Sequence, residues 1–594
     1  MPRAWAGQSR SQAFVLGTLE SPWTRFDLWK GVMMSKRTLQ WAFVFLPAIL
    51  LVAACKSQSS VSNNRQEQTA PPGSLELIFT YGSEKEAWVK DVTAVFNVGD
   101  HKSSSGRKIF VTAIPLGSGE SVEEILAGKR QTHLISPASS AFIKLGNAQS
   151  RTQTGKDLVS TTETLVLSPV VVAMWKPMAE ALGWGKKPIG WSDILALARN
   201  EQGWSAYGRN QWGAFKFGHT HPEFSNSGLI SLLAEVYAAT GKVTGLTVAD
   251  VNKPNTAAYL EGIEQAVVHY GSSTGFFNTK MLSNGPEYLS AAVLYESNVI
   301  ESYSQQNNLP FPVVAIYPKE GTFWSDHPVG IVDREWVSPE HRDAAKTYIK
   351  FLMDRPQQEK TLSYGFHPGD VNIALTSPVD SQHGVDPLEP KTTLEMPSVE
   401  VMDAIVNLWK LHKKHSNIVL VFDTSGSMKE NNKLPNAKLG ARQLVTLLDA
   451  NDYLSILPFS SSPSWAGKDL LIQKDRESAL RTIDSFFASG GTALYDSVGA
   501  AYQSLLDAPK SRNISAIIVL TDGADTDSKT SLADLLAQIQ FDNERRTIRV
   551  FTIGYGSDAV KDVLKSIADA TQARFYEGTP QNIESVFKEI STFF

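Results

Sequence analysis

The stretch VFDTSGSM, residues 421–428, ends an apolar run and begins a series of oxygen-bearing side chains. Ile418 to Phe422 is entirely apolar, which is typical of a strand buried on both faces. Asp423, Ser425 and Ser427 then follow at alternate positions. Oxygen-bearing side chains placed directly after a buried strand predict a binding site at the end of that strand.

The chain after this stretch alternates between helical and strand patterns. The apolar strands are uninterrupted, which predicts a parallel sheet covered by helices on both faces. Ligands of such doubly wound α/β domains bind at the carboxyl ends of the strands. The predicted helices are 437–448, 479–491, 531–539 and 585–594, and the predicted strands are 418–422, 453–459, 514–521 and 547–556.

Two further segments bring oxygen atoms to the same edge of this sheet. SGGTALYDS contributes Thr492, and the strand IIVLTD ends at Asp522. Together with the first stretch they supply three hydroxyls and two carboxylates, without His or Cys. Such hard oxygen ligands suit Mg²⁺, Ca²⁺ or Mn²⁺ rather than zinc or copper. Mg²⁺ keeps water molecules in its coordination shell, so we expect one position to stay open to another ligand.

The order DxSxS, GGT, TDG resembles the metal-ion-dependent adhesion site of von Willebrand factor A (VWA) domains. The resemblance covers roughly 416–594, and all five positions match, namely Asp423, Ser425, Ser427, Thr492 and Asp522. It implies a Rossmann-like fold that binds Mg²⁺ (or Ca²⁺ or Mn²⁺). It also implies that an Asp or Glu of a protein partner completes the coordination of the metal.

The first part of the chain repeats a unit of strand, small-residue loop and helix. LELIFTY (75–81), KIFVTAIPL (108–116) and HLIS (133–136) are the strands, which predicts a second parallel sheet. Capping boxes at Ser83 with Glu86 and at Ser121 with Glu124 would begin two of the helices.

The loops after these strands gather Gly and Ser, where backbone N–H groups and helix N-termini converge. They offer hydrogen-bond donors and no positive side chain of their own, which predicts a small polar or anionic ligand. Serines that only cap helices are the alternative. The candidate ligand-binding residues are Ser83, Ser118, Ser139, Ser140, Asn226, Ser227, Ser272 and Tyr295.

Two segments of this part, Ser168–Ala198 and Val313–Val332, resemble the lobe crossings of type II extracytoplasmic solute-binding proteins. The resemblance covers about 74–376 and implies a two-lobed, periplasmic-binding-protein-like α/β domain that closes on a solute. A second class of function follows from it, in which the chain is the substrate-binding receptor of an ABC transporter and the VWA domain is accessory.

The one cysteine, Cys55, follows a basic and then an apolar segment. Lys36 and Arg37 precede the apolar run 41–54, as in a secretory signal peptide. The ending VAAC resembles the lipobox of bacterial lipoproteins, which implies acylation of Cys55 and a lipid-anchored protein on the extracytoplasmic face of a membrane.

These patterns predict six segments. They are an upstream extension that is not native (1–32), a signal peptide (33–54), a lipidated cysteine and tether (55–73), a solute-binding-like domain (74–376), a linker (377–397) and an entry helix with the VWA domain (398–594). The net charge is −5 and charges of both signs are well mixed along the chain, so the sequence indicates no basic surface that would bind nucleic acid. We find no nucleophile elbow and no His–carboxylate cluster, so we expect binding and not catalysis.

Overall fold

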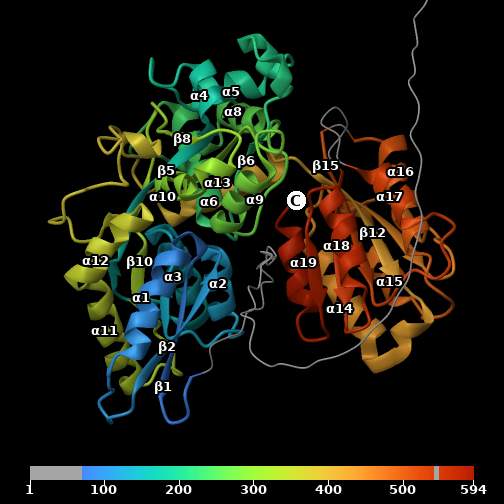
Figure 1. Cartoon of the computed structure of the whole chain (residues 1–594), viewed down its shortest axis with the longest axis horizontal. Helices are drawn as coiled ribbons and strands as arrows, with labels where there is room; N and C mark the ends of the chain where they lie inside the picture. Colours follow the sequence, from blue (N-terminus) through green and yellow to red (C-terminus); the bar gives the residue numbers. More distant parts are fainter. Residues whose placement is uncertain (1–69, 511, 541–547) are drawn as a thin grey trace, which may run out of the picture. The chain divides into compact units, whose positions relative to one another are not determined.

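A computed structural model describes residues 70–510, 512–540 and 548–594. The predicted upstream extension, the signal peptide, Cys55 and most of the tether lie outside the described residues. Figure 1 shows an α/β chain, and the described residues form three sheets. Two of these sheets belong to the predicted solute-binding-like domain, one in each lobe, and the third belongs to the C-terminal domain.

The first lobe is built on a sheet of order β2-β1-β3-β10-β4, in which β1 pairs in parallel with β2 and β3. Trp88 and Phe96 of helix α1 share one hydrophobic core with Leu77 and Phe79 of β1. Its elements are β1 (Leu75–Gly82), η1 (Ser83–Lys85), α1 (Glu86–Val98), β2 (Ile109–Leu116), α2 (Ser118–Leu126), β3 (Leu134–Ser136), α3 (Ser140–Thr154), β4 (Thr162–Thr164), β10 (Pro328–Ile331), α11 (Pro339–Met353), α12 (Arg355–Thr361) and η5 (Leu362–Tyr364).

Most of the second lobe is inserted between β4 and β10, and the chain returns to it at β11, so the chain crosses from lobe to lobe more than once. Its sheet has the order β11-β5-β7-β6, with β8 and β9 also paired to β5. Its elements are β5 (Val166–Trp175), α4 (Lys176–Leu182), α5 (Trp191–Ala198), η2 (Gly203–Tyr207), η3 (Asn210–Trp212), β6 (Phe217–Gly218), α6 (Asn226–Thr240), α7 (Val248–Val251), α8 (Pro254–Glu264), α9 (Thr274–Asn284), β7 (Ala291–Tyr295), α10 (Glu296–Ser302), η4 (Tyr303–Asn308), β8 (Val313–Ile316), β9 (Trp324–Ser325) and β11 (His367–Pro368).

The proline-rich segment predicted as a linker packs along the second lobe. Gly384 accepts a backbone hydrogen bond from Ala315, and Leu394 is buried. After η6 (Ser381–His383), α13 (Val399–His412) begins where Ser398 caps it through the backbone N–H of Val401. The Trp409 ring lies 5.2 Å from that of Tyr270, so this entry helix packs against the second lobe.

The C-terminal domain has a sheet of order β14-β13-β12-β15-β16-β17, in which only the edge strand β14 is antiparallel. This confirms the predicted doubly wound fold. Its elements are β12 (Ser416–Asp423), η7 (Gly426–Asn432), α14 (Lys433–Leu447), β13 (Tyr453–Phe459), β14 (Gly467–Leu471), α15 (Ile472–Asp484), α16 (Leu494–Asp507), β15 (Ile514–Thr521), α17 (Leu532–Ile539), β16 (Ile548–Tyr555), α18 (Lys561–Ala570), β17 (Phe575–Gly578) and α19 (Ile583–Ser591).

The central strand β12 is buried on both faces, as its uninterrupted apolar sequence predicts. Leu420 and Phe422 point to the side covered by α14, α15 and α19. Val419 and Val421 point to the side covered by α16, α17 and α18. Figure 1 shows these helices flanking the sheet. Because both faces are closed, the strand is apolar from Ile418 to Phe422, and Asp423 is the first polar side chain toward its carboxyl end.

Both predicted capping boxes of the first lobe are wrong. Helix α1 begins at Glu86 after a short 3₁₀ turn, and the Ser83 hydroxyl accepts instead from Gly275 N of the second lobe. Helix α2 begins three residues early, at Ser118, with Glu120 accepting from Gly117 N. In both cases a tertiary contact engages the serine, since the Ser121 hydroxyl donates to Thr80 Oγ1 at 2.8 Å.

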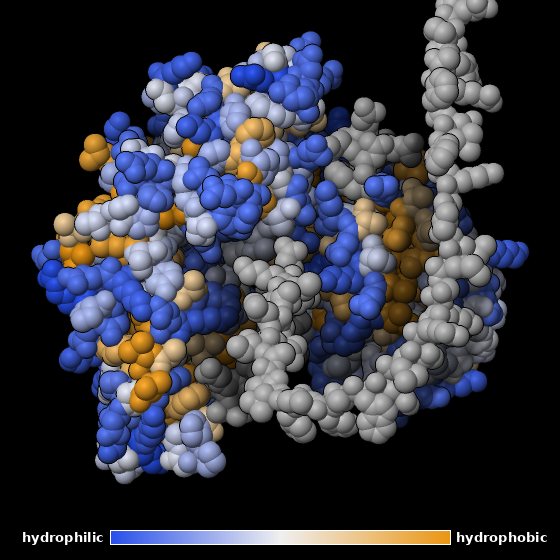
Figure 2. Space-filling model, viewed as in Figure 1, coloured by the Kyte–Doolittle hydropathy of each residue, from blue (hydrophilic) through white to orange (hydrophobic). Residues whose placement is uncertain are grey.

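Hydrophilic residues cover much of the face drawn in Figure 2, with hydrophobic patches between them. Among the described residues no helix combines the length and the apolar character that a membrane span requires.

Candidate functional site

Asp423 is the last residue of β12 and is fully buried at the carboxyl edge of the C-terminal sheet. Its Oδ1 accepts from the backbone N–H of Ser425 at 2.7 Å, and its Oδ2 accepts from the Thr521 hydroxyl at 2.5 Å. These bonds fix the carboxylate between the ends of two adjacent strands. The apolar run of β12 therefore determines where this carboxylate is placed.

Ser425, Ser427 and Asp522 form a continuous chain of hydrogen bonds. The Ser425 and Ser427 hydroxyl oxygens are 3.1 Å apart, and Ser427 donates to Asp522 Oδ1 at 2.7 Å. Asp522 follows β15, the strand paired with β12. The structure thus brings together four residues that the sequence predicts at one edge, although Asp522 lies far along the chain.

The loop that carries Thr492 joins the same edge through its backbone. Gly426 N donates to Gly490 O at 2.9 Å. Thr492 is buried, and Thr526 makes two hydrogen bonds with its backbone. The Thr526 N–H donates to the Thr492 carbonyl, and the Thr492 N–H donates to the Thr526 hydroxyl at 2.9 Å. Asp423 at the end of β12 and the other four predicted metal-site residues, in the loops connected to it, therefore lie at one edge of one sheet.

Lys433 is part of this cluster, and sequence reasoning missed it. Its ammonium lies 2.8 Å from Asp522 Oδ2 and 3.1 Å from Asp558 Oδ2. Burial lowers the pKa of Lys433, but the hydrogen bonds to these two carboxylates outweigh burial and raise it above its usual value. Burial raises the pKa of Asp423, against the hydrogen bonds from Thr521 and Ser425, and the neighbouring Asp522 charge adds to the increase.

The chemistry of these side chains fits a hard divalent cation. Ser425, Ser427 and Thr492 supply hydroxyl oxygens, and Asp423 and Asp522 supply two buried carboxylates. Two buried carboxylates in contact through hydroxyls carry negative charge that a cation would neutralise. In the described part of the chain, this edge included, no group of three or more His, Cys, Asp or Glu side chains is placed to hold a metal ion, so a cation here would depend on the hydroxyls as well as the two carboxylates.

The predicted solute-site residues converge between the two lobes, around Asn226. The Asn226 amide nitrogen donates to Tyr295 Oη at 2.9 Å, and its oxygen accepts from the Ser139 hydroxyl at 2.5 Å. The backbone N–H of Ser140, at the start of α3, donates to Asp326 Oδ1 at 2.8 Å. Ser139 and Ser140 come from the first lobe and Asn226 and Tyr295 from the second, so these bonds join the lobes.

The other predicted residues lie in separate contacts. Ser118 Oγ accepts from Ala138 N at 3.0 Å, within the first lobe. Ser227 bonds with Thr220 and Thr274 inside the second lobe. Ser83 bonds to Gly275 N, and a Cβ added to Gly117 would lie 2.9 Å from Ser272 O. Backbone from the two lobes therefore meets closely at Gly117, where only glycine fits.

Glu84, Lys85 and His327 form a buried charged cluster beside these residues. Glu84 Oε1 lies 2.8 Å from Lys85 Nζ and 3.1 Å from His327 Nδ1. Burial raises the pKa of Glu84, but the Lys85 charge and the His327 hydrogen bond outweigh it and hold that pKa at about 2. The expectation that these loops carry no positive side chain is wrong. The sequence SEK directly after the first strand already contains this lysine, Lys85, and could have indicated a positive side chain in the loop.

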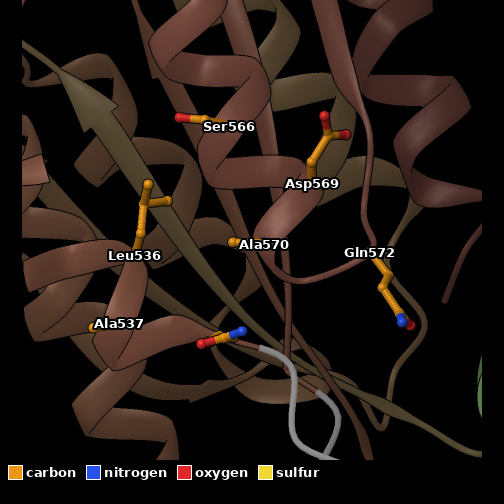
Figure 3. Close-up of a pocket in the computed structure, with 7 residues that line it drawn as sticks. Leu536, Ala537, Ser566, Asp569, Ala570 and Gln572 are labelled. Atoms are coloured by element: carbon orange, nitrogen blue, oxygen red, sulfur yellow. The ribbon is translucent and has the colours of Figure 1, made fainter. Parts of the chain in front are cut away.

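A hollow of about 600 Å³ between α17 and α18 lies away from the metal-site edge. Figure 3 shows Leu536 and Ala537 on one helix and Ser566, Asp569 and Ala570 on the other, around this space. These residues belong to the later halves of helices that run antiparallel to the strands. They therefore lie toward the amino ends of the strands.

Comparison with known proteins assigns both domains. Residues 417–589 match the family model of the von Willebrand factor type A domain, and 78–367 match that of the bacterial extracellular solute-binding protein. A Mycobacterium tuberculosis protein is 21% identical over 449 residues, which are 73% of this chain and 63% of that protein. The chain therefore spans less than two thirds of that relative's length.

Two solved structures are similar to parts of this chain. A von Willebrand factor type A structure from Catenulispora acidiphila is 23% identical, covering 30% of this chain and 42% of that one at a TM-score of 0.27. The sulfate-binding protein SubI of Mycobacterium tuberculosis is 16% identical, covering 52% of this chain and 92% of that one at a TM-score of 0.34.

Proposed function

We propose that this chain, an extracellular solute-binding domain followed by a von Willebrand factor type A domain, is a lipid-anchored binding protein of the extracytoplasmic face. The extracellular solute-binding match supports this location. Cys55, which lies outside the described residues, is the proposed site of acylation. The VWA domain binds a protein partner through a divalent cation, and the first domain binds a small solute. The role is binding, not catalysis.

One observation carries the adhesion proposal. Asp423, Ser425, Ser427 and Asp522 form one hydrogen-bonded set at the carboxyl edge of the sheet, above an entirely apolar core. These four residues and Thr492 would hold Mg²⁺, or Ca²⁺ or Mn²⁺. When bound, the cation supplies an open coordination position for the carboxylate of an Asp or Glu on the partner.

An exposed aromatic residue borders this edge and suits a protein partner. Phe487 is 75% exposed, in a loop whose Ser489 N–H donates to Thr424 O at 2.7 Å. Exposed aromatic side chains are frequent anchors of protein interfaces. The proposed partner therefore presents a carboxylate beside an apolar surface that covers Phe487.

The adhesion proposal is tested by titrating the EDTA-treated full chain with MgCl₂ in a calorimeter and by following partner capture. Cross-linking on intact cells should trap a partner whose capture EDTA abolishes and Mg²⁺ restores. Asp507→Asn is the matched control, because it removes one carboxylate at the end of α16, on the opposite edge of the sheet. Saturable Mg²⁺ binding that Asp423→Asn leaves unchanged would refute the adhesion site.

For the first domain we propose a neutral polar solute rather than an anion. The Asp326 carboxylate already bonds the first N–H of α3, where an anion would bind, and Lys85 already pairs with Glu84. Among the described residues, His327 Nε2 and Ser297 Oγ are buried without a hydrogen-bond partner, and a polar solute would satisfy such atoms. A thermal-shift screen of sugars, amino acids and anions tests this, and stabilisation by anions alone would contradict it.

The match to a solute-binding family over 78–367 also favours a second function, that of a receptor for an ABC transporter. In that case the solute that stabilises the first domain should enter cells more slowly when the gene is deleted. Unchanged uptake of that solute would contradict the receptor function and leave adhesion as the proposed function.

A further inference from the structure

The ammonium group of a buried lysine, Lys433, lies beside the proposed metal site of the VWA domain. Lys433 is the first residue of α14, and its side chain is 6% exposed. The two residues before it, Asn431 and Asn432, have φ of 50° and 56°, a left-handed conformation that L side chains rarely adopt. This turn directs Lys433 inward, and its Cε lies 3.5 Å from where a Cβ on Gly556 would be.

Two carboxylates compete for the Lys433 ammonium. Asp522 Oδ2 lies 2.8 Å from it and is buried with the metal-site residues. Asp558 Oδ2 lies 3.1 Å away, on a side chain that is 65% exposed. The other oxygen of Asp522 accepts from Ser427, so both oxygens of this carboxylate are already bonded within the chain.

We infer that Lys433 is a built-in monovalent cation that shares Asp522 with the divalent ion and thereby limits how tightly the site holds that ion. The inference rests on the proposed metal site and adds a residue that sets its affinity. A divalent ion that uses Asp522 must tolerate a nearby ammonium, because two cations on one buried carboxylate repel each other.

Asp558 has the opposite effect in this arrangement. It attracts the ammonium away from Asp522, and because it is exposed it does so at little desolvation cost. Without Asp558, the ammonium would pair with Asp522 alone and compete more strongly with the divalent ion. Removing the lysine should therefore tighten divalent binding, whereas removing Asp558 should weaken it.

A lysine with only a structural role would behave differently. Breaking a buried ion pair destabilises the fold and disorders the groups around it. In that case Lys433→Met would weaken divalent binding or leave it unchanged. The sign of the change in affinity therefore separates the two roles, and differential scanning calorimetry in EDTA separately reports any loss of stability.

The experiment titrates the EDTA-treated full chain with MgCl₂ and MnCl₂ by isothermal calorimetry. We expect Lys433→Met to bind Mg²⁺ about tenfold more tightly than wild type and Asp558→Asn to bind it several-fold more weakly. In the Lys433→Met background, Asp558→Asn should have little further effect, because no ammonium remains to be redirected. Lys561→Met is the matched control, since Lys561 pairs with exposed Glu577 at 2.8 Å in the same region.

The outcomes also separate this inference from the proposed function. Equal Mg²⁺ affinity in wild type and Lys433→Met, or weaker binding in Lys433→Met, overturns the inference and leaves the adhesion site standing. Binding by Lys433→Met but not by wild type supports the inference and overturns the proposal that the natural site takes a divalent ion. No binding by any variant overturns both. If Lys433→Met fails to fold, weaker binding by Asp558→Asn than by wild type supports the inference, and equal or tighter binding overturns it.

Discussion

Asp423→Asn should remove divalent-ion binding without unfolding the VWA domain. The asparagine keeps an oxygen acceptor for the Ser425 N–H, and the Thr521 hydroxyl can rotate to accept from the new amide. The substitution also removes a buried negative charge that lies beside that of Asp522, and the repulsion between the two contributes to the raised pKa of Asp423. In EDTA we therefore expect the variant to be within about 1 kcal/mol of wild type, or more stable.

The loss of ion affinity follows from Coulomb's law. Two unit charges about 4 Å apart near a protein surface interact by about 4 kcal/mol, and a divalent ion doubles this before desolvation is counted. Even if desolvation cancels half of the total, about 4 kcal/mol is lost, which is a factor of about 1,000 in the dissociation constant. Millimolar Mg²⁺ should then leave the Asp423→Asn site empty.

Calorimetric melting with and without Mg²⁺ measures both effects. At an ion concentration about 100 times the dissociation constant, wild type should gain about 2.7 kcal/mol. For a domain of this size that corresponds to roughly 5–10 °C in melting temperature. Asp507→Asn should retain the whole increase and Asp423→Asn none of it. An Asp423→Asn variant that gains as much from Mg²⁺ as wild type would refute the assignment of the metal site.

Four further outcomes are expected. Thr492→Ala should weaken Mg²⁺ binding about tenfold, less than the loss of Asp423, because water can replace one neutral oxygen. Burial, with the nearby His341, lowers the pKa of His133 to about 4, and its Nδ1 accepts from Ile78 N. As the pH falls, the unfolded chain therefore binds a proton at His133 before the folded chain does. The free energy of unfolding should fall by about 2 kcal/mol from pH 6.5 toward pH 4, after allowing for solvent screening. His133→Gln should reduce this fall in melts measured at different pH values. Asp326→Ala should free the first N–H of α3, so that sulfate raises the melting temperature of the variant but not of wild type. Cys55→Ser should move the protein out of the membrane fraction, and an unmodified Cys55 in membrane-bound protein, found by mass spectrometry, would contradict the lipid anchor.

The C-terminal domain is largely predictable from sequence because its strands are continuous apolar runs. Val419 and Leu420 require opposite faces of one sheet to be covered, which a doubly wound arrangement provides. The oxygen-bearing residues come directly after these runs, so their place at the carboxyl edge follows from the topology. The role of Lys433 could not be predicted in this way, because its partner Asp558 is 125 positions away and no periodic pattern links the two residues.

In the first domain, tertiary contacts override the local sequence patterns. The serine after the first strand has the spacing of a helix cap, yet its hydroxyl accepts from Gly275 N of the other lobe. The start of α3 has the features of an anion site, yet Asp326, 186 positions away, already bonds there. Each predicted loop lies between the lobes, but which side chains fill it depends on contacts that only the folded chain brings together.

A partner bound at the metal site would make β12 the strand that carries mechanical load. The chain enters β12 at Ser416, and the metal site begins at its other end, at Asp423. A pull between these two ends would run along the covalent backbone of the strand and would not shear its hydrogen-bond ladders. Only the share of the load that reaches the ion through Asp522, which follows β15, would cross the parallel ladder between β12 and β15, from Ser416 to Phe422. The direct path through β12 would therefore carry tension without unfolding the sheet.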